Sequence, residues 1–448
     1  MKNHTKLLLS AFLIFFACEN AQEQKKQDTT TVQQVSTDIL AVNENKIPEG
    51  EQTIAIVGAT LIDGNGGEPL QNACVIIKNN EIWKVGAKEN TEIPEEAEVV
   101  DATGLSLLPG LIDAHFHLDN ASTLPAQFLQ NGVTSVRDPG AWIEDYQEVR
   151  NSSQPIPRLF LTGPHLDMFP PAYPKNSSMV RDVVEAREQV QFFANQGASA
   201  IKVYFRISPE IMQTICSTAQ ALGLPTTAHL EITSATDAIK AGIDGIEHVT
   251  SFGIDLIPRQ QAEQYRQAVL ADNNARRNGR YEMWNGIDLN TPQADSLVQL
   301  IAQHQTYVSP TLAVFEYRLE GENTDSVKAN GFQNMMAFVG KAKKEGATVV
   351  VGSHSFVHYA DLGWAFQREM ELLAESGLSN AEVIEAATME NARFFRIEDR
   401  LGSIEAGKQA DLILINGNPL EDIKAMYNIE KVMLNGIWVP STLPTAHH

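Results

Sequence analysis

The stretch "SAIKVYFRISPEIMQTICSTAQALGLPTTAHLE", residues 199–231, decides the fold. It opens with a short run of β-branched and aromatic residues typical of a buried strand, and its middle has the apolar spacing typical of a helix. Its end, "PTTAHLE", is a second strand-like run. A strand, a helix and a strand in this order favour a parallel sheet with a helical crossover.

The same alternation fills residues 108–400, where runs such as "VTSVRD", "DGIEHVT" and "TVVVGSH" separate longer helical patterns. This organisation predicts an α/β fold, a (β/α)8 TIM barrel. Short apolar runs broken by turn residues fill residues 52–107, and strand texture returns over residues 401–442. We therefore expect the two flanking segments to build one small β-sandwich domain beside the barrel.

Residues 1–18 have the features of a targeting segment. Two lysines precede the apolar run "LLLSAFLIFFA", which is too short to span a bilayer and ends at Cys18. The pattern resembles a bacterial lipoprotein signal, which implies lipidation of Cys18 and an exported protein anchored to the cell envelope. An ordinary secretory signal cleaved elsewhere is the alternative. Residues 19–51 are rich in Gln, Thr, Lys and Glu and predict a flexible stalk.

The charge balance narrows the classes of partner. The chain has 448 residues, with 34 basic and 56 acidic side chains and a formal net charge of −22. This charge repels phosphate backbones and anionic lipid surfaces, so we expect no nucleic-acid partner. Beyond the signal the cysteines are Cys74 and Cys216, each among apolar residues, which predicts buried free thiols.

Two histidines, His115 and His117, stand in "LLPGLIDAHFHL" at the end of a predicted strand. Residues i and i+2 of a strand face the same way, so both imidazoles can reach one point at the mouth of a barrel. Lys202, His229 and His248 each lie at or near the C-terminal end of another predicted strand, where barrel enzymes collect catalytic groups. Together they predict a site for zinc or a related ion.

From about residue 55 to residue 439 the chain resembles the amidohydrolase superfamily, in the branch related to imidazolonepropionase and prolidase-like dipeptidases. The resemblance rests on "LLPGLIDAHFH", "GVTSVRDPG" and "EDRLGSIEAGKQADLILINGNPLEDI". It implies one or two divalent metal ions, with zinc the expected metal. The implied ligands are His115, His117, Lys202, His229 and His248. The resemblance also admits a carboxylated Lys202 that bridges two metals.

The chain departs from its relatives at the end of the eighth strand. Relatives carry Gly-Thr-Asp or Gly-Ser-Asp there, and this chain has Gly352, Ser353 and His354. In the family the aspartate ligates one metal, orients the attacking water and takes its proton. A neutral imidazole instead raises the formal charge of a two-metal site from about +1 to about +2, which weakens retention of the second metal. We expect His354 to act as a base or as a ligand, because a metal-bound nitrogen cannot also accept a proton.

Metal-dependent hydrolysis of an amide, peptide-like or cyclic-amide C–N bond is the function that these observations favour, with a small-molecule or dipeptide-like substrate. Two alternatives stay open: a binding protein on a catalytically impaired scaffold, and a lyase or isomerase with His354 as a proton shuttle. Tyr204 and His358 are candidate substrate contacts, with a packed aromatic and a surface loop residue as the alternatives. Residues 163–178 and 254–290 are candidate walls of the pocket.

Overall fold

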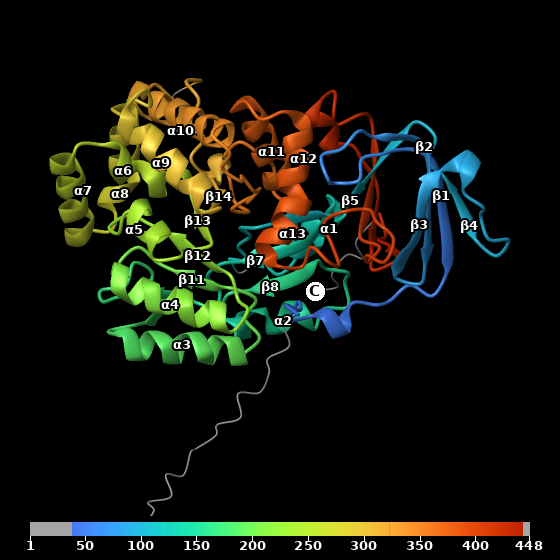
Figure 1. The fold of residues 1–448 in the computed structure, drawn as a ribbon, viewed down its shortest axis with the longest axis horizontal. Helices are drawn as coiled ribbons and strands as arrows, with labels where there is room; N and C mark the ends of the chain where they lie inside the picture. Colours follow the sequence, from blue (N-terminus) through green and yellow to red (C-terminus); the bar gives the residue numbers. More distant parts are fainter. Residues whose placement is uncertain (1–37, 120, 322, 442–448) are drawn as a thin grey trace, which may run out of the picture. The chain divides into compact units, whose positions relative to one another are not determined.

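The computed structural model describes residues 38–119, 121–321 and 323–441. A mixed eight-stranded sheet contains strands from both ends of this region (Figure 1). Its strands are β1 (Thr53–Leu61), β2 (Leu70–Lys78), β3 (Glu81–Ala87), β4 (Glu98–Asp101), β5 (Leu105–Pro109), β15 (Leu412–Asn416), β16 (Ile429–Leu434) and β17 (Ile437–Trp438). Their order is β17-β16-β15-β5-β1-β2-β3, with β4 beside β1. Because β15 pairs antiparallel with β5, the two flanking segments share one sheet. The β-sandwich stays a prediction.

Two further sheets are parallel and carry the candidate residues. One consists of β6 (Leu111–Asp113), β7 (Val133–Asp138) and β8 (Arg158–Leu161). The other has the order β10-β9-β11-β12-β13-β14. Its strands are β9 (His165–Asp167), β10 (Ser177–Met179), β11 (Ile201–Val203), β12 (Thr226–His229), β13 (Gly245–Glu247) and β14 (Tyr307–Ser309).

Backbone hydrogen bonds also connect the two parallel sheets. The Ser199 nitrogen donates to the Leu161 oxygen at 2.7 Å, between the end of β8 and the start of β11. Residues 348–351 pair with β14 through a parallel bridge, and the Val351 oxygen accepts a hydrogen bond from the Ala114 nitrogen, just after β6, at 3.0 Å. These bonds are of the kind that a (β/α)8 barrel requires, and the closed barrel itself stays a prediction.

Helices fill the connections between the parallel strands, and α3 and α4 lie side by side (Figure 1). The helices are α1 (Leu124–Gln130), α2 (Gln147–Arg150), α3 (Val183–Asn195), α4 (Pro209–Ala221), α5 (Ala235–Lys240), α6 (Gly253–Leu256), α7 (Arg259–Ala271), α8 (Ala275–Asn285), α9 (Pro292–Gln303), α10 (Ser326–Lys344), α11 (Ala365–Glu375), α12 (Asn380–Ala387) and α13 (Met389–Phe395).

Residues 199–231 form the predicted strand, helix and strand, with β11 and β12 parallel. Helix α4 begins where the Ser208 side chain accepts a hydrogen bond from the Ile211 nitrogen and Pro209 occupies the first turn. Its apolar residues recur at helical spacing and are buried; they are Ile211, Met212, Ile215, Cys216 and Ala219. Local sequence alone therefore accounts for this unit.

The ordered fold begins before the predicted residue 52. The Asn43 side chain donates to the Pro157 oxygen and accepts from the Leu159 nitrogen, both at 2.9 Å, and Ile39 and Ile47 are buried. The prediction of a stalk over residues 19–51 is therefore wrong for its last part, because scattered apolar residues there find a partner surface far along the chain. Cys18 and the predicted signal lie outside the described residues.

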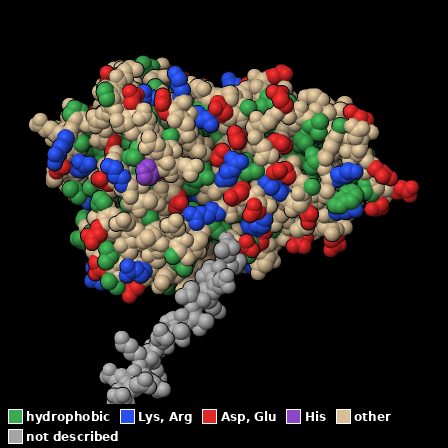
Figure 2. Space-filling model, in the orientation of Figure 1, with side chains coloured by type: hydrophobic (Ala, Val, Ile, Leu, Met, Phe, Trp, Pro, Cys, Tyr) green, Lys and Arg blue, Asp and Glu red, His purple; other side chains and the backbone are tan. Residues whose placement is uncertain are grey.

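Other expectations from composition have direct counterparts in the structure. Cys74 and Cys216 are both buried and free, as predicted. None of the helices in the described region combines the length and the apolar character needed to cross a bilayer. Acidic and basic side chains are interspersed on the face shown in Figure 2.

Candidate active site

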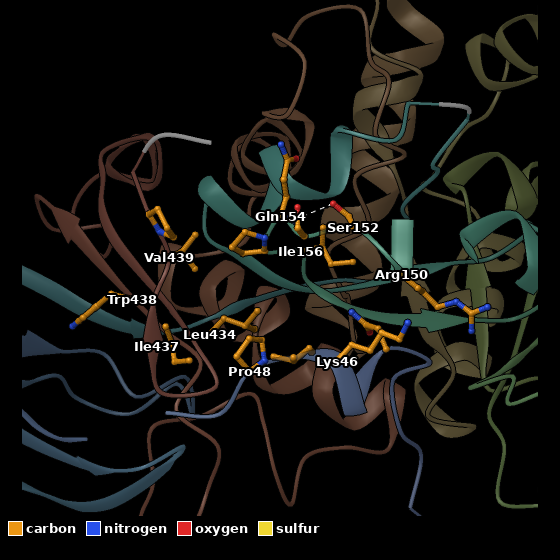
Figure 3. A pocket seen from close by; sticks show the side chains of 15 residues that line it. Lys46, Pro48, Arg150, Ser152, Gln154, Ile156, Leu434, Ile437, Trp438 and Val439 are labelled. Carbon is orange, nitrogen blue, oxygen red and sulfur yellow. Dashed lines mark hydrogen bonds between the residues drawn. The ribbon is translucent and has the colours of Figure 1, made fainter. Parts of the chain in front are cut away.

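A cavity of about 370 Å³ lies at the C-terminal ends of the parallel strands. Its lining includes His115, His117, Asp138, His165, Tyr173, Asn176, Lys202, Tyr204, His229, His248, Arg276, Arg280, Phe315, His354 and Phe356. The two segments predicted as walls, residues 163–178 and 254–290, both contribute to this list. Another hollow of about 290 Å³, formed by residues 43–48, 150–156 and 434–440, carries none of these histidines (Figure 3). The histidine-lined cavity is therefore the candidate active site.

The histidine pair follows β6 and its rings face one another. The Nε2 atoms of His115 and His117 lie 3.0 Å apart, although both residues lie just beyond the end of the strand. The buried Asp113 carboxylate accepts hydrogen bonds from the backbone nitrogens of His115 and Ser353 at 3.0 and 2.9 Å. The pair is thus tied to the loop that carries His354.

The His354 ring is placed by its backbone. The His354 nitrogen donates to the His115 oxygen at 2.6 Å, and the His117 nitrogen donates to the Ser355 hydroxyl at 2.7 Å. His354 and Ser355 have backbone φ values of 61° and 60°. Residues other than glycine adopt this left-handed conformation at a cost of about 1 kcal/mol or more. The His354 ring stacks on His115 with 5.2 Å between ring centroids. A strained loop held by hydrogen bonds therefore brings His354 to the histidine pair.

A carboxylate that the sequence argument did not select stands at the centre of the cluster. Glu247, the last residue of β13, is fully buried, and its Oε2 contacts the Lys202 ammonium and lies 3.1 Å from the His115 Nδ1. The next residue, His248, has φ 65°, and its Nδ1 lies 2.7 Å from the Thr311 hydroxyl. Glu247 therefore links the predicted ligands of three strands.

His229 ends β12 and points to a different set of partners. Its Nε2 lies 3.1 Å from both the Glu231 Oε1 and the Arg280 Nη2, although its ring centroid is 4.3 Å from that of His248. Arg280, on α8, forms an ion pair with Glu231, and the Tyr265 hydroxyl donates to the same carboxylate. These contacts fix the helical segment α7–α8 against the cavity.

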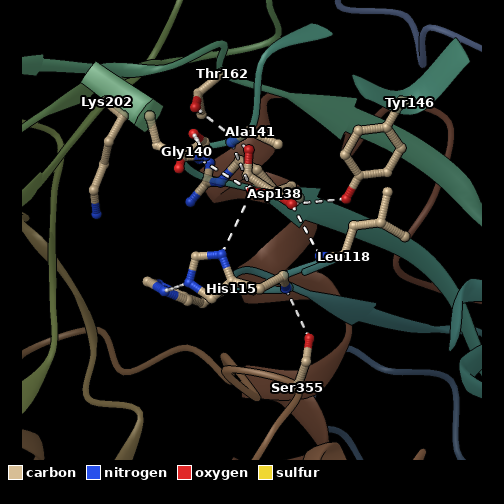
Figure 4. Close-up of polar contacts among 12 residues, drawn as sticks. His115, Leu118, Asp138, Gly140, Ala141, Tyr146, Thr162, Lys202 and Ser355 are labelled. Atoms are coloured by element: carbon tan, nitrogen blue, oxygen red, sulfur yellow. Dashed lines mark hydrogen bonds and ion pairs between the residues drawn. The ribbon is translucent and has the colours of Figure 1, made fainter. Parts of the chain in front are cut away.

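Asp138, at the end of β7, supports the site from a third side (Figure 4). Its carboxylate accepts hydrogen bonds from the nitrogens of Leu118, Gly140 and Ala141 and from the Tyr146 hydroxyl. The same carboxylate lies 3.6 Å from the Nδ1 of His117. Asp138 is thus positioned to orient that ring.

Burial decides the protonation of the cluster. It lowers the pKa of His115, His248 and His354 well below the usual range, and neighbouring imidazoles lower it further. Burial also lowers the pKa of His229 to about 3 and that of Lys202 well below its ordinary value. The imidazoles of these four histidines are therefore neutral near pH 7, the protonation state in which an imidazole can bind a cation.

Among the described residues, every predicted metal-binding, catalytic or substrate-binding residue except His358 lines the cavity. Tyr204 lies on the cavity wall, stacked on His165 at 4.3 Å between ring centroids. His358 is exposed, is absent from the cavity lining and packs on Tyr359, so the structure does not support it as a substrate contact. A position four residues after His354 does not determine which way a loop turns.

Five residues of the cavity or its cluster were not singled out by the sequence argument, although His165, Arg276 and Arg280 fall in the two segments predicted as walls. The five are Asp138, His165, Glu247, Arg276 and Arg280. Glu247 directly precedes His248, and Asp138 ends a strand, so strand-end position was a usable signal for both. The two arginines lie on a helix that joins the site only through tertiary packing, and no local pattern marks them.

The sequence pattern of the Amidohydrolase family matches residues 106–439. The chain belongs to this family. It is 24% identical over 449 residues to ochratoxinase of Aspergillus niger, covering 84% of this chain and 83% of that protein. A putative prolidase from Bifidobacterium longum is similar in structure, with a TM-score of 0.67 and 26% identity over 87% of this chain and 95% of the other. A Xaa-Pro dipeptidase with bound methionine has a TM-score of 0.67 at 22% identity, over 86% and 99%, which shows a shared fold.

The donors of this amidohydrolase suit a divalent metal ion. Potential ligand atoms form two groups, and within each group the atoms lie within 4.8 Å of one another. One group is His115, His117 and His354, and the other is His115, Glu247 and His248. The Nδ1 atom of His354 is buried and has no hydrogen-bond partner among the described residues. Buried nitrogen donors without partners cost free energy unless something binds them, and a cation satisfies them.

Proposed function

We propose that this amidohydrolase is a metal-dependent hydrolase that cleaves an amide, peptide-like or cyclic-amide C–N bond, with zinc the expected metal. The observation that carries the proposal is the convergence of His115, His117, His248 and His354 on one cavity, with the buried Glu247 carboxylate beside His115 and His248. Relatives named as ochratoxinase and prolidase support a hydrolase with a small or dipeptide-like substrate. A metal bound there would polarise the scissile carbonyl as a Lewis acid and lower the pKa of a water.

The protein's own residues orient these donors. Asp138 faces the Nδ1 of His117 and leaves Nε2 directed at His115. Glu247 holds both His115 and Lys202, so Lys202 is positioned at the edge of the cluster by a buried ion pair. Outer carboxylates of this kind fix the ring orientation of metal-binding histidines. A carboxylated Lys202 belongs to the same proposal as a modified form of that side chain.

His354 stands beside the histidine pair, where the sequence argument placed the proton acceptor. Its Nδ1 has no hydrogen-bond partner among the described residues, so this atom is available to accept a proton from the attacking water or to serve as a ligand. Phe315 and Phe356 line the same cavity and limit access of bulk water to the reacting bond.

The first test combines metal content with turnover on the full chain purified without chelators. Dipeptides, N-acyl amino acids and cyclic amides are assayed in ¹⁸O-labelled water beside His354→Asp and His354→Ala. We expect bound metal, ¹⁸O in the acid product, and a rise in metal content in His354→Asp. Incorporation of ¹⁸O identifies hydrolysis and counts against a lyase or isomerase. Metal-replete protein that hydrolyses nothing, and gains nothing from His354→Asp, would contradict the proposal.

A binding protein on the same scaffold is the second candidate. It is favoured by the Arg280 guanidinium, which contacts the Nε2 of His229 and so occupies a predicted ligand atom. Recovery of a tightly bound ligand in unchanged form would support this candidate, and multiple turnover would exclude it.

Export and lipid anchoring at Cys18 form a separate proposal that rests on the sequence alone. Mass analysis of the mature N-terminus tests it. A lipid-modified Cys18 supports the anchor, and an unmodified N-terminus elsewhere supports an ordinary secretory signal.

A further inference from the structure

The helical wall of the cavity carries a cation without an acidic partner. Arg276, on α8, is only 6% exposed and lines the cavity. Its Nη2 donates to the Tyr173 hydroxyl at 2.6 Å and its Nε donates to the Asn273 oxygen at 3.1 Å. Its guanidinium lies 5.2 Å from the centroid of the Tyr173 ring. Each of these contacts orients the guanidinium, and none neutralises it.

Two other cationic side chains at the cavity have carboxylate partners. Lys202 pairs with Glu247, and Arg280 pairs with Glu231. Among the described residues no carboxylate lies within ion-pair distance of Arg276. Arg206, close by, adds a further positive charge and donates to Asn273. A desolvated, uncompensated guanidinium is costly, and an anion supplied by a ligand removes that cost.

We propose that Arg276, assisted by the Tyr173 hydroxyl, binds a carboxylate of the substrate, so that the substrate class is amides of free amino acids: N-acylated amino acids and dipeptides with an open C-terminus. The inference rests on the proposed function, because it assigns a substrate class to the same cavity. A guanidinium favours carboxylates since its planar fork matches two oxygens at once.

The placement of Arg276 relative to the histidines agrees with this class. Arg280 touches His229, and Arg276 lies four residues earlier on the same helix, about 6 Å along its axis. Tyr204 fills the intervening wall, with its ring centroid 4.9 Å from His229 and 5.9 Å from Tyr173. The carboxylate would therefore lie a short distance from the scissile bond, as it does when both belong to one amino-acid residue.

Matched ligands that differ only in charge test the subsite. N-acetyl-L-phenylalanine, N-acetyl-L-leucine and N-acetyl-L-proline are titrated into the full chain as purified, each beside its primary amide, and kcat/KM replaces Kd wherever a product forms. We expect at least one acid to bind roughly 10- to 100-fold more tightly than its amide. The preference should weaken at high salt and fall below about threefold in Arg276→Met. Arg277→Met, an exposed neighbour on α8, is the matched control and should keep the full preference.

The comparison of acid and amide binding to the wild-type protein needs no variant. The proposal can therefore be refuted even if Arg276→Met does not fold. Equal binding of acid and amide, no saturable binding of any acid up to about 20 mM, or a preference that survives in Arg276→Met would each overturn it. Turnover with no preference for the acid over its amide would refute the carboxylate subsite and leave the proposed hydrolysis unaffected. Charge preference without turnover would support the subsite and contradict the hydrolysis.

Discussion

Removal of the Glu231 carboxylate tests how the helical wall of the cavity is held. Glu231 is buried and receives Arg280 from α8 and Tyr265 from α7. Although burial raises the pKa of Glu231, the Arg280 guanidinium lowers it from its ordinary 4.5 to about 2. That difference corresponds to about 3 kcal/mol of stability at neutral pH. Removal of one partner from a buried ion pair costs about 3–5 kcal/mol, so the two magnitudes agree.

The assay is urea unfolding at pH 7 with excess chelator, followed by tryptophan fluorescence, because Trp284 lies buried in α8. We expect Glu231→Gln to lower the free energy of unfolding by about 3 kcal/mol. The double variant with Arg280→Met should lose less free energy of unfolding than the sum of the losses in the two single variants. Each single variant leaves one buried charge without its partner, and the double variant removes both charges. Glu263→Gln, an exposed carboxylate on α7, is the control and should change stability by less than about 0.5 kcal/mol.

The pH dependence supplies a second check on the same pair. Because the folded-state pKa of Glu231 is depressed, its stabilisation is present above pH 4.5 and is lost as the pH falls toward 2. The stability gap between wild type and Glu231→Gln should therefore close over this window. A gap below about 1 kcal/mol at pH 7, or one that stays constant down to pH 2, would refute the reasoning.

Three further predictions concern buried carboxylates. Asp138→Asn should weaken zinc binding roughly 10- to 100-fold in a chelator competition, because it loosens His117, while the exposed Asp145→Asn should not; equal affinities would contradict this. Asp113→Ala should lower the free energy of unfolding by about 3 kcal/mol in urea, since it leaves two buried backbone N–H groups without an acceptor, and a loss below about 1 kcal/mol would refute it. Burial raises the pKa of Glu369 to about 8, so its stabilisation is complete below pH 4.5 and is lost as the pH rises to 8. Relative to Glu369→Gln, wild type should lose roughly 5 kcal/mol across that window in pH-dependent unfolding, and a flat difference would count against the assignment.

The positions of the candidate ligands were predictable because each is marked by its own strand. His115 and His117 directly follow β6, and Lys202 and His229 lie on the two strands of one β-α-β unit. Alternation of side chains along a strand is a local property, so it can be read without a three-dimensional structure. The end of the predicted stalk was not predictable in the same way, since burial of Asn43 depends on residues more than a hundred positions away.

Partnerships among those residues were decided only by the tertiary structure. Asp113 meets Ser353 across 240 positions, and Glu231 meets Arg280 across 49. Such contacts depend on how loops and inserted helices return to the strand ends, and side chains that meet this way leave no periodic signal in the sequence. The sequence alone therefore determined the parallel α/β architecture and the histidines at its strand ends. Packing at long range determined that Glu247 stands among them and that Arg276 faces the cavity without a direct carboxylate partner among the described residues, because ion pairs form between neighbours in space.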